Sequence, residues 1–269
     1  MVITKESLIL VENTEVISSH LVRKVKVDFY LPVNVAAPDQ MSILLINDGQ
    51  DLERMGFEGL LNTLYEQRAI SPVLCVGIHA GIERKMEYGT ASQPDFKGRG
   101  AKASEYTRFV MEELLPLIQV NYHLPVTRTK AIAGFSLGAL SALDIAWNHP
   151  TEFSTIGVFS GSLWWRSKDQ YDETYDDDKD RIMHQIIRKS TIKPRLKFFF
   201  ESGKLDEQRD RNKNGVIDSI DDTLDLIAEL KAKGYKESDI EFLLLEEGKH
   251  DVETWGVAMP YFLKWAFAK

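Results

Sequence analysis

The chain has 269 residues, of which 43% are hydrophobic and 28% are charged, a composition that suits one globular domain over residues 1–269. Its formal net charge of −8 argues against nucleic acid as the main partner, and a highly anionic ligand would need a local basic patch. No apolar run is long enough to span a membrane. We therefore expect neither nucleic acid nor a membrane as a partner.

Eight segments have the composition of β-strands. Six of them are near-continuous apolar runs, which are typical of central strands buried on both faces of a parallel sheet. By contrast, 21–31 alternates apolar and polar residues and should have one solvated face. The predicted strands are residues 7–11, 21–31, 41–46, 73–78, 130–133, 154–159, 196–200 and 240–245.

Helical patterns lie between these strands. The segment 104–120 begins with a plausible N-cap at Ser104 and has apolar residues at helical spacing, with Pro116 expected to kink it. Strands first, and then alternating strands and helices, predict an α/β fold with a mostly parallel eight-stranded sheet and helices on both faces. The other predicted helices are 139–147, 222–233 and 254–267.

The single cysteine and the N-terminus bear on the compartment. Cys75 lies in the apolar run 72–78 and is typical of a buried strand residue rather than a reactive thiol. One cysteine cannot form an internal disulfide, which fits a reducing compartment. The first residues, MVITKE, lack the charged-then-apolar layout of a signal peptide. We therefore predict a cytoplasmic protein.

Residues 134–138 spell G-F-S-L-G, an instance of the G-x-S-x-G pattern between a predicted strand and a predicted helix. Strand, sharp turn and helix form the context of the nucleophile elbow in α/β-hydrolases. The glycines permit a tight turn, and the helix N-terminus behind Ser136 favours developing negative charge. The alternative is an ordinary glycine-rich turn whose serine caps the helix. The flanking pattern favours Ser136 as a nucleophile.

A serine nucleophile needs a base within hydrogen-bond reach, and the base needs an orienting acid. His250 lies between the last predicted strand and the final helix, the loop in which this fold carries its base. Asp206 lies in the loop after the strand 196–200 and is our choice for the acid, with Glu201 and Glu207 as rivals. The spacing thus predicts Ser136, Asp206 and His250 as a triad.

The tetrahedral intermediate needs two backbone N–H donors. One should be Leu137, which follows the nucleophile, and the other should come from the loop after the third strand, where Gln50 or Asp51 would donate. The alternative for this loop, N-D-G-Q-D, is a plain Asp-Gly turn.

Several stretches together resemble a known family. LLINDGQDL, VGIHAGIERKMEYG, GVFSGSLWW, FFFESGKLDE and GKHDVETW occur in order along with the elbow, and the similarity runs from about residue 20 to the end. They resemble the esterase D-like family of putative esterases, α/β-hydrolases that include enterochelin, feruloyl and acetyl-xylan esterases, S-formylglutathione hydrolases and mycolyltransferases. The resemblance implies Ser136 as nucleophile, His250 as base and Asp206 as acid, and it implies the loop around Gln50 for the oxyanion.

The stretch 160–165, S-G-S-L-W-W, is most similar to the siderophore-esterase branch of that family. Trp164 and Trp165 could form a wall for an aromatic acyl group, or they could simply pack a lid into the core. Two charged segments are expected to be solvated loops: the acidic segment 171–180 in the probable lid, and the basic cluster of Lys97, Arg99 and Lys102.

A second motif lies at residues 210–221, D-R-N-K-N-G-V-I-D-S-I-D. It fits a twelve-residue calcium loop, with oxygen-bearing side chains at positions 1, 3, 5, 9 and 12, a glycine at 6 and a backbone carbonyl at 7. With only three carboxylates, its affinity should be micromolar or weaker. The alternative is a metal-free Asn/Asp/Gly-rich turn. The predicted ligands are Asp210, Asn212, Asn214, Val216, Asp218 and Asp221.

The sequence therefore predicts a serine carboxyl-ester hydrolase that needs no cofactor for catalysis and holds a structural Ca²⁺. The expected substrate is a small-molecule ester of the aromatic-acyl or siderophore type. Alternatives within the same chemistry are carbohydrate-linked feruloyl or acetyl esters and acyl transfer to an alcohol. An alternative of another class is a non-catalytic, calcium-stabilised binding module on a hydrolase scaffold.

Overall fold

A single eight-stranded sheet organises the part of the chain that this computed structural model describes, residues 7–33, 35, 41–123 and 130–269. The strand order is β1-β2-β4-β3-β5-β6-β7-β8; β1 and β2 are antiparallel to their neighbours, and β4, β3, β5, β6, β7 and β8 run parallel. The strands are β1 Ile9–Ser18, β2 Arg23–Pro32, β3 Ser42–Asn47, β4 Val73–Ile78, β5 Lys130–Phe135, β6 Thr155–Phe159, β7 Lys197–Leu205 and β8 Ile240–Lys249.

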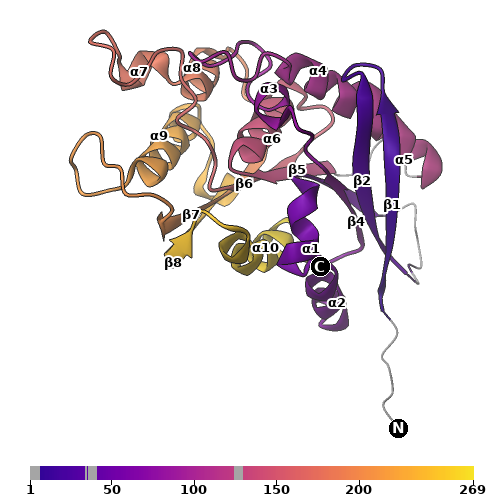
Figure 1. The fold of residues 1–269 in the computed structure, drawn as a ribbon. Helices are drawn as coiled ribbons and strands as arrows, with labels where there is room; N and C mark the ends of the chain where they lie inside the picture. The colour runs from indigo at the N-terminus through magenta and orange to yellow at the C-terminus, as the bar shows by residue number, and fades with distance from the viewer. Residues whose placement is uncertain (1–6, 34, 36–40, 124–129) are drawn as a thin grey trace.

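Helices cover both faces of this sheet (Figure 1). Alternate residues of a strand face opposite sides, so Ile43 and Leu45 join one apolar cluster while Leu44 and Ile46 join the other. The first cluster contains side chains of the helices α4 (Ala103–Arg108), α5 (Leu115–Asn121), α6 (Leu137–Asn148), α8 (Ile182–Lys189) and α9 (Asp218–Ala232). The second contains side chains of α1 (Leu52–Met55), α2 (Phe57–Glu66) and α10 (Val252–Phe267). The predicted α/β-hydrolase architecture is therefore confirmed.

The helices predicted at 139–147, 222–233 and 254–267 are present with shifted ends, whereas the helices at 52–55, 57–66, 84–87, 177–180 and 182–189 were not predicted. The α-helices are α1 Leu52–Met55, α2 Phe57–Glu66, α3 Arg84–Glu87, α4 Ala103–Arg108, α5 Leu115–Asn121, α6 Leu137–Asn148, α7 Asp177–Asp180, α8 Ile182–Lys189, α9 Asp218–Ala232 and α10 Val252–Phe267. Short 3₁₀ turns are η2 Gly49–Asp51 and η4 Glu237–Asp239, and η3 Phe109–Leu114 is a π-helical segment.

Two predicted elements need correction. The first strand was expected over 7–11, but β1 pairs with β2 along ten residues, because antiparallel backbone bonds hold its polar centre where no apolar pattern marks it. The helix expected over 104–120 is divided into α4, η3 and α5. Ser104 lies inside α4 rather than at its N-cap, and the π-helical turn precedes Pro116 near the start of α5, where proline fits without losing a bond.

The sheet sets the frame for the candidate site. The central strand β5 is buried along its whole length, and the carboxyl ends of β5 to β8 meet at one edge of the sheet. Cys75 is fully buried in β4, and burial raises the pKa of its thiol. Across the described residues, no helix has both the length and the apolar character that a bilayer crossing requires.

Candidate active site

Ser136 occupies a strained turn between β5 and α6. Its backbone angles are φ 55° and ψ −117°, a conformation that side-chain-bearing residues adopt rarely and mainly at functional sites. The turn is locked on both sides: the Ser136 N–H donates to the Phe159 carbonyl at 2.9 Å, and its carbonyl accepts from the Ser162 N–H at 3.0 Å. A side chain at Gly134 would overlap the backbone of Gly138, so glycine is required for β5 and α6 to approach this closely. The hydroxyl is thereby held at the tip of the elbow.

His250 lies within hydrogen-bond distance of this hydroxyl, with 2.9 Å between its Nε2 and Ser136 Oγ. It follows β8 and precedes α10, whose N-cap Asp251 accepts a hydrogen bond from the Thr254 N–H at 2.9 Å. Trp255, in the first turn of α10, contacts the imidazole edge-on at 5.4 Å between ring centroids. The imidazole is 41% exposed on its outer side, so a substrate can reach it.

Of the three acid candidates, Asp206 faces the imidazole. Its Oδ2 lies 3.7 Å from His250 Nδ1, longer than a hydrogen bond, although such bonds commonly tighten when substrate binds. The Asp206 carboxyl is buried, and neither oxygen has a hydrogen-bond partner among the described residues. The carboxyl of Glu201 instead accepts a hydrogen bond from Ser160, and Glu207 lines the neighbouring cavity.

The two predicted oxyanion donors, Leu137 and Gln50, belong to two different elements near the Ser136 turn. Leu137 is the first residue of α6, and the first backbone N–H groups of a helix have no acceptor within the helix. Gln50 lies in the η2 turn after β3, the strand beside β5. Its side chain fixes that turn, since Oε1 accepts from the Ala80 N–H at 3.0 Å and Nε2 donates to Asp48 at 3.2 Å.

Sequence reasoning missed an ion pair that holds this turn. Asp48 is fully buried in the left-handed conformation, and its carboxylate binds the Arg84 guanidinium through two bonds of 2.6 and 2.7 Å. Its N–H donates to the hydroxyl of Tyr88 at 3.2 Å. Arg84 lies beyond β4, about 36 positions away in sequence, so only the proximity of β3 to β4 in the sheet could have pointed to it.

Ser162 was also missed. Its Oγ lies 3.4 Å from Ser136 Oγ, and its backbone supports the elbow as described above. It follows β6, the strand next to β5, and position at the carboxyl end of a neighbouring strand was the available signal.

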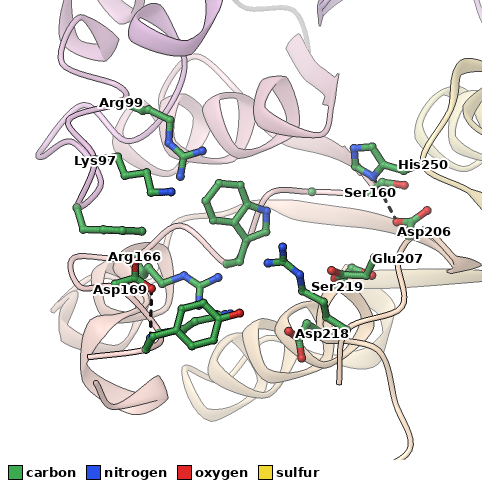
Figure 2. Close-up of a pocket in the computed structure, with 16 residues that line it drawn as sticks. Lys97, Arg99, Ser160, Arg166, Asp169, Asp206, Glu207, Asp218, Ser219 and His250 are labelled. Atoms are coloured by element: carbon green, nitrogen blue, oxygen red, sulfur yellow. Dashed lines mark hydrogen bonds and ion pairs between the residues drawn. The ribbon is translucent and has the colours of Figure 1, made fainter. Parts of the chain in front are cut away.

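A cavity of about 470 Å³ opens beside His250 (Figure 2). Its lining mixes aromatic, cationic and carboxyl side chains: Phe96, Lys97, Arg99, Ser160, Gly161, Trp164, Arg166, Asp169, Gln170, Tyr171, Asp206, Glu207, Arg209, Asp218, Ser219 and His250. Lys97, Arg99 and Arg166 lie on the side away from His250 and Asp206 (Figure 2). The cavity therefore has His250 and Asp206 at one end and a cationic wall at the other.

The basic cluster is a solvated loop only in part. Lys97 is exposed, as predicted, and Lys102 pairs with Glu83, whereas Arg99 is partly buried. Both Lys97 and Arg99 line the cavity. The Arg99 guanidinium lies over the Trp164 ring at 4.8 Å, where a cation–π contact compensates part of its lost hydration, and it is also bound by the buried Asp95. These partners explain why the charge is held against the cavity.

Trp164 and Trp165 have different surroundings. Trp164 lines the cavity between Arg99 and Arg166, whose guanidinium lies 5.8 Å from its ring. Trp165 is fully buried and does not line the cavity, which corrects its prediction as a substrate-binding residue. Its ring fills the space beside Gly89 and Gly100, where a side chain on either glycine would collide with it.

The acidic segment 171–180 is exposed only in part. Tyr171 lines the cavity and is 82% exposed, whereas Asp180 is buried. Asp177, at the start of α7, binds the Arg211 guanidinium at 3.0 Å. The expectation of a fully solvated loop therefore fails at its end, because Arg211 anchors α7 to the segment after β7.

Residues 210–217 form a compact loop ahead of α9, and residues 218–221 of the predicted calcium motif are the first turn of that helix. Asp210 accepts hydrogen bonds from the backbone of Asn214 and Gly215, and the amides of Asn212 and Asn214 both donate to Asp221 at 2.8 Å. Four predicted calcium ligands thus converge: Asp210, Asn212, Asn214 and Asp221.

Asp218 departs from this arrangement. Its carboxylate accepts from the Arg211 N–H at 2.8 Å and also pairs with the Arg211 guanidinium. Through the described part of the chain, no three His, Cys, Asp or Glu side chains are grouped as a metal site. The loop can offer oxygen ligands to a cation, but mainly from amides and two carboxylates.

The comparisons with known proteins agree with this fold. In sequence, the chain is 23% identical to the uncharacterized protein YbbA of Bacillus subtilis, over 94% of this chain and 96% of that protein. It is 30% identical to the diacylglycerol acyltransferase/mycolyltransferase Ag85A of Mycobacterium tuberculosis, but over 57% of this chain and only 43% of that protein.

Among solved structures, an enterobactin esterase from Shigella flexneri in the presence of enterobactin aligns with a TM-score of 0.75 at 19% identity, covering 97% of this chain and 59% of that one. A ferulic acid esterase aligns with a TM-score of 0.73 at 18% identity, covering 97% and 99%. The model of the putative esterase family matches residues 18–266. The chain therefore belongs to this esterase family and is a carboxylic ester hydrolase with the α/β-hydrolase fold.

Proposed function

We propose that the protein hydrolyses esters through an acyl-enzyme formed on Ser136, with His250 as general base and Asp206 as the acid that orients it. The observation that carries this proposal is the 2.9 Å separation between Ser136 Oγ and His250 Nε2 at a strained elbow. A serine hydroxyl is a weak nucleophile until a neighbouring base accepts its proton. Here the base stands within reach, and a buried carboxyl faces its other nitrogen.

In the first half-reaction, Ser136 Oγ attacks the ester carbonyl carbon while His250 Nε2 accepts the hydroxyl proton. The tetrahedral oxyanion receives hydrogen bonds from the backbone N–H groups of Leu137 and Gln50. The C–O bond to the alcohol then breaks, and the imidazolium returns its proton to the departing alcohol oxygen. Water, activated by His250, next attacks the acyl-enzyme, and the acid is released with Ser136 restored.

The substrate is an ester with an aromatic acyl part that carries negative charge, as in siderophore-type esters, rather than a neutral feruloyl ester. This choice is supported by the cavity, where Trp164 offers a ring face and Arg99, Arg166 and Lys97 form a cationic wall (Figure 2). Asp169 lies on the same wall, and Arg99 is already paired with the buried Asp95. Lys97 and Arg166 remain as cations that favour an anionic ligand locally in a protein whose net charge is −8. The fold neighbour solved with enterobactin is consistent with this class.

The test compares one lactone in two charge states. The substrates are a catechol-bearing trilactone without iron and its anionic iron complex, with methyl ferulate as a neutral aromatic ester. Ser136→Ala should abolish turnover of each. Arg166→Gln should raise KM about ten-fold for the iron complex and leave the iron-free lactone nearly unchanged.

Lys168→Gln is the matched control, because Lys168 lies two residues away and pairs with Asp180 instead of lining the cavity. A KM rise in Arg166→Gln that is equal for charged and uncharged lactones would contradict the anionic assignment. A strong preference for methyl ferulate would favour the carbohydrate-linked ester class.

We further propose that the 210–221 loop binds one Ca²⁺ through Asp210, Asn212, Asn214, Asp221 and the Val216 carbonyl, with a role in structure rather than in catalysis. The proposal is supported by the convergence of four of these side chains on the loop interior. Asp218, turned to Arg211, would contribute only by rotating. Calorimetric titration of the purified protein with Ca²⁺ measures the site directly, and absence of heat at millimolar Ca²⁺ would remove it.

A further inference from the structure

A second carboxyl group is buried behind the proposed triad. Glu201 lies in the middle of β7, between Phe159 of β6 and Leu243 of β8 in the sheet register, and it is 1% exposed. Its Oε1 and both oxygens of Asp206 are buried without a hydrogen-bond partner in the described chain. Burying a carboxyl oxygen that receives no hydrogen bond costs free energy, so the two neighbouring carboxyl groups of Glu201 and Asp206 are an unusual feature of this site.

Glu201 is connected to the imidazole through two neutral side chains. Its Oε2 accepts from Ser160 Oγ at 3.4 Å, and the Ser160 N–H donates to the Glu201 carbonyl at 2.9 Å. Ser160 Oγ in turn accepts from the indole Nε1 of Trp255 at 3.0 Å. Trp255 meets His250 edge-on, and it also stacks on Phe135 with 4.9 Å between ring centroids. Because Phe135 directly precedes Ser136, this tryptophan spans the base and the nucleophile.

The charges around Glu201 favour its neutral form. Burial raises its pKa to about 8, and the nearby negative charges of Asp206 and Asp251 act in the same direction. From β6 and α10 it is faced by the neutral Ser160 and Trp255. Beyond Asp206 lies His250, which accepts the serine proton in the proposed mechanism. Two carboxylates so placed disfavour each other's ionisation, so one holds a proton near neutral pH.

We propose that Glu201 is a positioning residue that works as a neutral carboxylic acid: through Ser160 and Trp255 it fixes the imidazole of His250, and it leaves Asp206 as the single buried anion behind that imidazole. This inference rests on the proposed serine mechanism. It gives Glu201 a part distinct from that of the acid that faces Nδ1.

The proposal predicts a fall of activity at alkaline pH. As pH rises through about 8, Glu201 loses its proton and a second negative charge appears beside Asp206. The two carboxylates then repel, and a displacement of Glu201 is passed through its hydrogen bond with Ser160 to Trp255, which loosens Trp255 against His250. Glu201→Gln keeps a neutral, hydrogen-bonding side chain of the same size at every pH, so it should lack this alkaline fall.

The experiment measures kcat from about pH 6 to about pH 10 for wild type, Glu201→Gln and Trp255→Phe, with Glu246→Gln as matched control. Glu246 is an exposed β8 carboxylate that pairs with Lys204. Wild type and the control should lose about ten-fold between pH 8 and pH 10, whereas Glu201→Gln should not. Trp255→Phe, which removes the indole donor, should lower kcat more than it changes KM.

A second readout does not depend on turnover. Infrared difference spectra of Ser136→Ala should show a protonated carboxyl band that disappears near pH 8 and is missing in Ser136→Ala/Glu201→Gln. An alkaline fall shared by wild type and Glu201→Gln, or no such band near neutral pH, would overturn the proposal. Lack of serine-dependent turnover with the band present would instead reject the serine mechanism on which the kinetic role depends, and with it the positioning role.

Discussion

The two halves of the candidate site are held in different ways. The half around Ser136 is fixed by backbone contacts and buried side chains: Gly134 against Gly138, and the Asp48–Arg84 pair under the η2 turn. The half that carries Asp206 continues into the 206–221 segment, which is held mostly by exposed polar contacts and ion pairs. The first arrangement fixes the position of the Ser136 hydroxyl, whereas the contacts of the second are expected to change with bound cations and with salt concentration.

The difference has a consequence for substrate recognition. The cavity draws Trp164 and Arg166 from the segment after β6, but Glu207, Arg209 and Asp218 from the segment after β7. Chemistry is thus supported by the packed half, while one wall of the binding cavity belongs to the polar half.

The largest effect is expected at the point where the halves meet. Asp206→Asn should lower kcat by roughly 10³–10⁴-fold with little change in KM, because the neutral amide can no longer favour the imidazolium. Glu207→Gln is the comparison, since this neighbour lines the cavity without contacting the imidazole. The measurement is steady-state kinetics of each variant on an activated ester. If Glu207→Gln or Glu201→Gln lost more activity than Asp206→Asn, the triad acid would have to be reassigned.

The packed half should be most sensitive at its buried ion pair. Arg84→Met leaves the fully buried Asp48 without its cation, which should cost about 3–5 kcal/mol of unfolding free energy and displace the η2 turn. Loss of one oxyanion donor would lower kcat by roughly 10²-fold. The matched control is Arg54→Met, which breaks the exposed Arg54–Glu253 pair and should leave the unfolding free energy nearly unchanged. Similar urea-unfolding curves for both variants would contradict this contrast.

The fold could be predicted where the burial of an element determines its pattern of apolar residues. The strand 73–78 was predicted with its observed bounds, because a strand covered on both faces is apolar throughout. The polar centre of β1 has no such apolar pattern, because its pairing with β2 depends on backbone hydrogen bonds. Likewise the π-helical η3 lies inside a stretch whose apolar spacing predicts a continuous α-helix.

For the site, motif and chain order pointed to Ser136 and His250, which the fold brings together. They could not locate the cationic wall, because Arg99 is turned inward by Trp164, a residue 65 positions later. The prediction that Trp165 binds substrate was wrong for the same reason: its ring is buried against Gly89 and Gly100, which lie far from it in the sequence. Contacts between distant segments, rather than the identity of a residue, separate a binding side chain from a core side chain.

A smaller effect is expected in the pH dependence of stability. Because the folded state raises the pKa of Glu201 from 4.5 to about 8, the native protein binds more protons than the unfolded chain between these values. The stability that the neutral carboxyl contributes is therefore complete below about pH 4.5 and is lost as pH rises through about 8. Wild type should lose a few kcal/mol relative to Glu201→Gln by about pH 9, as measured by urea unfolding at each pH. Parallel stability curves for the two proteins would contradict it.

The smallest effect should fall in the polar half. Ca²⁺ at about 100 times its Kd adds about 2.7 kcal/mol to a protein that binds it only when folded, which raises Tm by roughly 5–10 °C. Chelation should reverse this shift and lower kcat only a few-fold, because the loop begins four residues after Asp206 while the elbow does not depend on it. Asp221→Asn should make Tm insensitive to Ca²⁺, whereas Glu237→Gln, at an exposed carboxylate outside the loop, should not. If chelation abolished activity without lowering Tm, the cation would act in catalysis, and the separation between a precise half and an adaptable half would fail.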